Sequence, residues 1–146
     1  MTTPRKAHLE AAYLATSYFV DGPEGRFAIR VGAVSPEADA LAAAQHVNTW
    51  AFITAYNPGS VAAPAEDNRA RQDELERAVT AAGLPFYRGE GKGDGAWPAE
   101  PSLLVLGIGA DDAAALARRF GQAAFVFGAR GAAARLAWID VRHFGQ

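Results

Sequence analysis

Polar side chains gather where the most apolar segment of the chain ends. Thr54 and Asn57 lie at or just after the end of the segment 50–56, and Asn68 and Arg71 follow shortly afterwards. Carboxamides can orient a polar ligand, and a guanidinium can form two parallel hydrogen bonds to a phosphate or carboxylate. Backbone N–H groups at a helix N-terminus add donors that favour an anion. These four residues therefore predict a pocket for a small polar or anionic, nucleotide-like ligand.

Helical periodicity places Asn68 and Arg71 on the inward side of a helix expected from about residue 65 to residue 82. At 100° per residue, its core-facing stripe consists of Leu75, Ala78, Val79 and Ala82. The same stripe extends back to Asn68 and Arg71, and burying such polar groups is costly unless they are paired. Two interpretations stay open. Either the two residues face a ligand, or Arg71 binds backbone carbonyls to fix the loop while Asn68 completes a turn.

Three residues further along the chain are candidate contributors to the same pocket. Trp97 is a candidate cover or stacking surface, and Glu100 would be a general acid or base if it were buried near Arg71. The simpler interpretation of Glu100 is a solvated carboxylate at the start of a strand. Gln122 either bonds the open carbonyls of the preceding helix or reaches the pocket. None of these residues is identified as catalytic, so the sequence leaves open whether the protein is an enzyme.

The glycine-rich segment 89–95 separates two of the expected strands. It has glycine at alternate positions and contains Lys92, which would be a charge partner if the segment folded over a ligand. It matches no phosphate-binding loop, because no helix follows it. We expect a flexible connector, with closure over a ligand as the alternative.

Composition and residue counts exclude several kinds of site. The chain has 146 residues and no cysteine, which rules out disulfides and thiolate metal ligands. Its three histidines are far apart and have no metal-ligand spacing, so we predict no metal site and no bound cofactor. The net charge of −2 argues against duplex nucleic acid, whose binding proteins usually present a basic face.

The pattern of apolar residues predicts an α/β or α+β fold. Strands are expected over 12–20, 26–31, 50–56, 84–88, 102–108, 123–127 and 135–141. Helices are expected over 35–46, 65–82 and 111–119. These elements predict a flexible N-terminal segment over 1–11 and a single compact domain over 12–146, in which about three helices pack on a mixed β-sheet.

Five motifs in the chain are similar to those of a bacterial family, the domain of unknown function 3293. They are YLATSY at 13–18, WAFITAYNPGS at 50–60, NRAR at 68–71, WPAEPS at 97–102 and FGQAA at 120–124. They span nearly the whole chain in the expected order. The family pattern before the arginine typically has glutamate ahead of the asparagine, and here Asp67 takes that place. The resemblance implies a compact protein and carries no assigned activity.

A second function class stays open, in which the polar cluster is structural and the protein is a non-catalytic interaction module. Its protein partner would bind exposed aromatics such as Phe86, Tyr87, Trp97 or Trp138. A third hypothesis is single-stranded nucleic-acid binding by Tyr87, Arg88, Lys92 and Trp97, which the net charge disfavours. No segment is long and apolar enough to span a membrane, so we expect a cytoplasmic protein.

Overall fold

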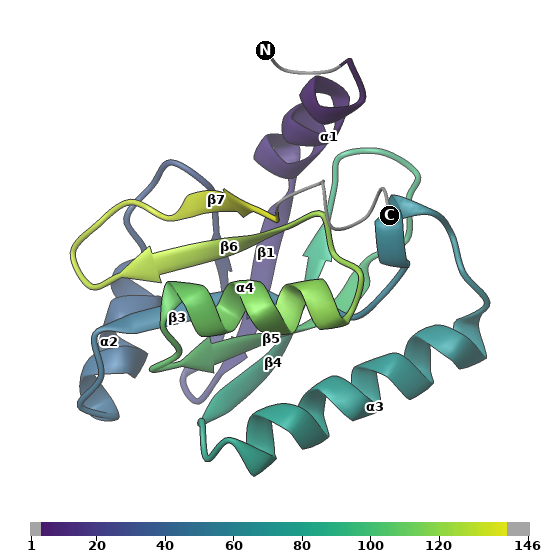
Figure 1. Ribbon diagram of the computed structural model, residues 1–146. Helices are drawn as coiled ribbons and strands as arrows, with labels where there is room; N and C mark the ends of the chain where they lie inside the picture. Colours follow the sequence, from purple (N-terminus) through teal and green to yellow (C-terminus); the bar gives the residue numbers. More distant parts are fainter. Residues whose placement is uncertain (1–3, 140–146) are drawn as a thin grey trace.

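The structure is a computed structural model and describes residues 4–139 of the chain. Its strands form one sheet in the order β2-β1-β4-β5-β3-β6-β7, and all neighbouring pairs are antiparallel (Figure 1). The strands are β1 (Ser17–Gly22), β2 (Gly25–Ile29), β3 (Thr49–Ile53), β4 (Phe86–Lys92), β5 (Glu100–Leu106), β6 (Ala124–Ala129) and β7 (Arg135–Trp138). The helices are α1 (Pro4–Ala15), α2 (Pro36–Ala44), α3 (Ala65–Ala81) and α4 (Ala110–Arg119), with a short 3₁₀ turn η1 (Pro58–Ser60). The fold class is therefore α+β.

The prediction of a mixed sheet is wrong, because a strand is inserted into each βαβ crossover. α3 connects β3 to β4, which run in the same direction, but β5 lies between them and is antiparallel to both. α4 likewise connects β5 to β6, with β3 between them. This β3-α3-β4-β5-α4-β6 unit is the split βαβ arrangement.

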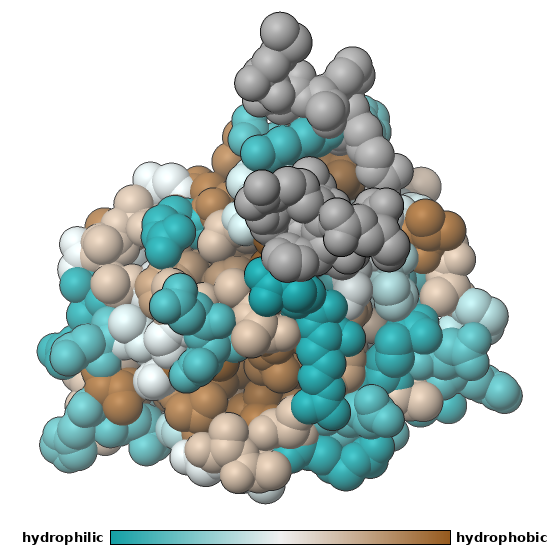
Figure 2. Space-filling model, in the orientation of Figure 1, coloured by the Kyte–Doolittle hydropathy of each residue, from teal (hydrophilic) through white to brown (hydrophobic). Residues whose placement is uncertain are grey.

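The side chains of the central strands alternate between two hydrophobic clusters. On one face, residues such as Ile53 and Val105 pack with Leu75 of α3 and Ala117 of α4. Figure 1 shows both helices lying on that face. Figure 2 shows hydrophobic residues at the surface in the gap between these helices, and hydrophilic residues along the outer side of α3. The period of two along each strand places the neighbouring residues on the opposite face.

The second cluster lies inside a curl of the sheet. It joins Phe52 and Leu104 of the central strands to Tyr18 of β1, and Ala38 of α2 packs against it. The segments next to β2 and β7, the two outer strands, meet through hydrogen bonds between Gly32 N–H and Ala134 O and between Ala134 N–H and Ala33 O. The sheet therefore curls until its two edges approach each other, and its inner face encloses this cluster.

The N-terminal region differs from the prediction. The strand expected from residue 12 begins only at Ser17, because α1 occupies Pro4–Ala15 and adds a fourth α-helix to the predicted three. The segment 4–15 has four alanines and two leucines, together with one glutamate, one lysine and one arginine, all of which are strong helix formers. The division into a flexible segment over 1–11 and one domain stays a prediction. The end of the strand expected over 135–141 lies outside the described residues.

The glycine-rich segment is partly a strand. β4 continues through Gly89 to Lys92 and pairs with β1. A Cβ at Gly89 would overlap the Phe19 backbone of β1, so glycine permits the close approach of the two strands there. Only the residues after Lys92 form the connection to β5. None of the helices described over residues 4–139 has the length and hydropathy needed to cross a lipid bilayer.

Candidate functional site

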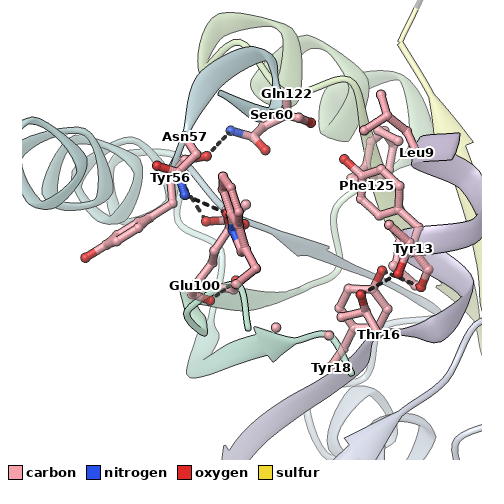
Figure 3. Close-up of a pocket in the computed structure, with 18 of the residues that line it drawn as sticks. Leu9, Tyr13, Thr16, Tyr18, Tyr56, Asn57, Ser60, Glu100, Gln122 and Phe125 are labelled. Atoms are coloured by element: carbon pink, nitrogen blue, oxygen red, sulfur yellow. Dashed lines mark hydrogen bonds between the residues drawn. The ribbon is translucent and has the colours of Figure 1, made fainter. Parts of the chain in front are cut away.

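A cavity of about 530 Å³ lies at one end of the curled sheet, beneath α1. Inner-face side chains of the strands, such as Phe52 of β3 and Ser102 of β5, line it from the sheet. Figure 3 shows Tyr13, Thr16 and Tyr18 on one side and Tyr56, Asn57 and Glu100 on the other, with Ser60 and Gln122 at one end. The site therefore combines one helix, the end of β3 and the start of β5.

Asn57 links the start of α3 to the cavity. Its backbone is left-handed, with φ of 49°, a conformation that asparagine tolerates better than most residues. Its N–H donates to Asn68 Oδ1 at 2.8 Å, and Asn68 Nδ2 donates to Asn57 Oδ1 at 2.8 Å. Asn57 Nδ2 then donates to Glu100 Oε2 at 2.7 Å. Every polar atom of the Asn57 side chain is used, which fixes the position of the Glu100 carboxylate.

Glu100 is the acidic centre of the cavity. Its Oε2 accepts hydrogen bonds from Asn57 Nδ2 and from Trp97 Nε1, the latter at 2.9 Å. Within the described part of the chain, Glu100 has no ion-pair partner and its Oε1 accepts no hydrogen bond. The half-buried carboxylate therefore keeps one oxygen for another donor.

Asn68 and Arg71 do not line the cavity. Asn68 is buried behind Asn57, and Arg71 is half-buried beside it. The Arg71 guanidinium donates to Ala55 O at 3.3 Å and to Asn68 Oδ1 at 2.8 Å. Buried Gln72, which the sequence analysis did not single out, accepts from Ala55 N–H at 3.0 Å. These contacts correspond to the interpretation in which Arg71 binds backbone carbonyls and fixes the end of β3.

The other predicted residues do line the cavity, namely Thr54, Asn57, Trp97, Glu100 and Gln122. Thr54 Oγ1 donates to Pro101 O at 2.7 Å and accepts from Tyr56 N–H at 3.0 Å, so it joins β3 to β5. Gln122 fills both of the roles considered for it. Its Nε2 donates to Phe120 O at the end of α4 and to Tyr56 O at 3.0 Å beside the cavity.

The loop before β5 is organised by Lys92. Its ammonium donates to Gly95 O at 3.0 Å and to Trp97 O at 2.9 Å. These bonds hold the loop in a fixed turn at the cavity rim, where Trp97 is 46 % exposed. The lysine charge is thus used within the loop, and Lys92 forms no ion pair with Glu100.

The contribution of α1 to the cavity was not predicted from the sequence. Leu9 and Tyr13 of this helix and Thr16 just after it line the cavity, and Tyr18 Oη donates to Tyr13 O at 2.9 Å. Burial, reinforced by the negative charge of Glu100, raises the pKa of Tyr13 to about 12. Burial also raises the pKa of Tyr18. The spacing of Leu9 and Tyr13, four residues apart in a segment of helix formers, is the sequence signal that would have placed them on one helix face.

The lining is aromatic and acidic. Among the described residues around the cavity, the charged side chains are the carboxylates Glu100 and Asp94, and none is lysine or arginine. The only other side chain there that can carry a positive charge is His8, which is exposed. Across residues 4–139, no three histidine, aspartate or glutamate side chains converge as they would around a metal ion.

Comparison with known proteins gives one match. A family model described as "Protein of unknown function (DUF3293)" matches residues 53–125, which is half of the chain. The match runs from the end of β3 to β6 and includes Asn57, Glu100 and Gln122. Neither a search of curated proteins nor a search of solved structures returned a match.

Proposed function

The chain belongs to this family of unknown function, and we propose that it binds a small organic molecule in the cavity between α1 and the curled sheet. The observation that carries the proposal is the cavity itself. Its volume of about 530 Å³ is within the range of ligand pockets, which are mostly apolar with a few fixed polar groups. Its place at the mouth of a curled sheet is also typical of such pockets.

The side chains around the cavity support a ligand with an aromatic or apolar body and a polar head. Leu9, Phe52 and Tyr18 offer contact surface for the body. Glu100 Oε1 offers a fixed acceptor for the head, because Asn57 and Trp97 hold the other carboxylate oxygen. In this proposal Thr54, Asn57, Trp97, Glu100 and Gln122 form the polar side of the site, while Asn68 and Arg71 support it from outside.

Filling the cavity tests the proposal. Ala12 is an exposed α1 residue that lines the cavity, so Ala12→Trp should occupy the space without disturbing the core. Ala11, its exposed neighbour, does not line the cavity, and Ala11→Trp is the matched control. We expect native mass spectrometry of gently purified protein to show a retained small molecule on the wild type and on Ala11→Trp. The same extra mass on Ala12→Trp would contradict the proposal.

The interaction-module hypothesis lacks the exposed aromatic surface that it requires. Of its four aromatic residues only Trp97 is exposed. Phe86 and Tyr87 pack against the two core clusters, and Trp138 lies edge-on to Tyr13 at 5.9 Å between ring centroids. Of the residues proposed for single-stranded nucleic acid, Arg88 pairs with Glu76 at 2.7 Å and Lys92 donates to two carbonyls of its own loop. The cavity is therefore the better basis for a function.

A further inference from the structure

The charges around the cavity point to the chemical class of its ligand. Resting on the proposed function, we infer that the ligand carries a cationic head group, a protonated amine or a guanidinium, and that the Glu100 carboxylate binds it. This replaces the anionic ligand expected from the sequence, which depended on Arg71 facing the pocket.

The first observation is the state of the Glu100 carboxylate. Two neutral donors, Asn57 Nδ2 and Trp97 Nε1, fix one oxygen and leave the negative charge without a cationic partner in the described part of the chain. A half-buried carboxylate with a free oxygen gains most from a charged donor, because charge-assisted hydrogen bonds are roughly twice as strong as neutral ones. The site is thus built around an acceptor for a cation.

The second observation is that the nearby cationic side chains bind backbone or structural side-chain oxygens. Arg71 bonds Ala55 O and Asn68 Oδ1 behind the cavity wall, and Lys92 bonds two carbonyls of its own loop. Arg30 donates to Leu14 O, Ala15 O and Ser17 Oγ, at the junction of α1 and β1. Among the described residues that line the cavity, an anionic ligand would therefore meet the Glu100 carboxylate with no lysine or arginine to balance it, and only the exposed His8 could supply a positive charge there.

The third observation is the effect of Glu100 on the opposite wall. Its charge contributes to raising the pKa of Tyr13, so the cavity already disfavours a second negative charge as far away as α1. A positive head group has the opposite sign and is stabilised by the same field. Aromatic side chains that line the cavity with Glu100, among them Tyr56 and Trp97, also favour a cation over their faces.

Small molecules that share an aromatic ring system and differ in the charge of the head group test the inference. We would measure binding of tryptamine, tryptophol and indoleacetate, and of phenethylamine, phenylethanol and phenylacetate, by ligand-observed NMR and calorimetry. The protein samples are wild type, Glu100→Gln, Ala12→Trp and the control Glu74→Gln. Glu74 is an exposed α3 residue outside the cavity, so its substitution changes the net charge equally.

We expect the amines to bind wild type and Glu74→Gln about tenfold more tightly than the alcohols, which corresponds to about 1.4 kcal/mol. Glu100→Gln should remove this preference and leave the affinity for the alcohols unchanged. Alcohols or carboxylates that bind wild type as tightly as the amines, and are excluded by Ala12→Trp, would overturn the cationic head group and leave the proposed function standing. If no probe binds wild type, or if Ala12→Trp binds them equally, the proposed function fails and this inference fails with it.

Discussion

Asn57 and Asn68 are joined by two hydrogen bonds, one from the Asn57 N–H to Asn68 Oδ1 and one from Asn68 Nδ2 to Asn57 Oδ1, each 2.8 Å long. The pair connects the first turn of α3 to a left-handed residue at the cavity wall. Because Asn57 also holds Glu100, the position of the cavity carboxylate depends on a buried residue that never reaches the cavity.

Asn68→Ala should therefore destabilise the fold and loosen the site together. It leaves the Asn57 N–H and Oδ1 without their buried partner, and such losses cost about 2–3 kcal/mol in unfolding free energy. Chemical denaturation measures the loss, with Arg69→Ala, an exposed change on the same helix, as the control. An unfolding free energy equal to that of the control would show that the pair carries no structural role.

Arg71→Ala tests whether the Arg71 side chain stabilises the fold or contacts the ligand. The side chain bonds Ala55 O and Asn68 Oδ1 and does not line the cavity. We expect the unfolding free energy to fall by about 1–2 kcal/mol and probe affinity in the folded protein to stay within about threefold of wild type. Loss of binding with unchanged stability would instead restore the sequence-based hypothesis that Arg71 holds the ligand.

The strand β3 and the turn after it could be predicted from sequence because their signals are local, although β3 ends at Ile53 and not at residue 56 as predicted. Asn57 and Pro58 mark the turn after an apolar run, and the stripe of α3 extends to Asn68. Whether the arginine on that stripe faces a ligand or a carbonyl could not be predicted. The answer depends on where Asn57 lies relative to β5. The order of the strands in the sheet sets that position, and no property of α3 reveals it.

The pH dependence of the unfolding free energy should reveal the ionisation of the Tyr13 hydroxyl. Its pKa rises from 10.0 to about 12 on folding, so between these values the unfolded state has lost a proton that the folded state keeps. The stabilisation is fully present below pH 10 and is lost as the pH rises toward 12, by about 2–3 kcal/mol in unfolding free energy. Across this pH range, the unfolding free energy measured by chemical denaturation should fall less steeply with pH for Tyr13→Phe than for the wild type. An identical slope in the variant would show that Tyr13 is not the group responsible.

Gly128 of β6 should not tolerate a side chain. A Cβ there would overlap the indole ring of Trp50, which is 1 % exposed and fixed in the core. Gly128→Ala should cost about 1–3 kcal/mol of unfolding free energy. Gly95→Ala is the control, because open space surrounds that position. In a double variant with Trp50→Leu, the added cost of Gly128→Ala should shrink, and an undiminished cost would place the strain elsewhere.

The wall formed by α1 and the start of β1 was the part of the site hardest to predict. Tyr13, Thr16 and Tyr18 are residues that favour strands, so residues 12–20 resemble one continuous strand. The helix formers before Tyr13 outweigh this preference, and α1 packs over the open end of the sheet. That packing forms one wall of the cavity. It brings together residues that are about ninety positions apart in the chain, such as Tyr13 and Ser102.

Mapping where an aromatic fragment binds would show directly whether the cavity is the ligand site. Amide chemical shifts of isotope-labelled protein would be followed by NMR during titration with tryptamine, in wild type and in Ala12→Trp. We expect the largest shifts on residues that line the cavity, such as Thr16, Thr54 and Ser102, and we expect Ala12→Trp to abolish them. Largest shifts around exposed apolar residues outside the cavity, such as Val34 or Val61, would contradict it.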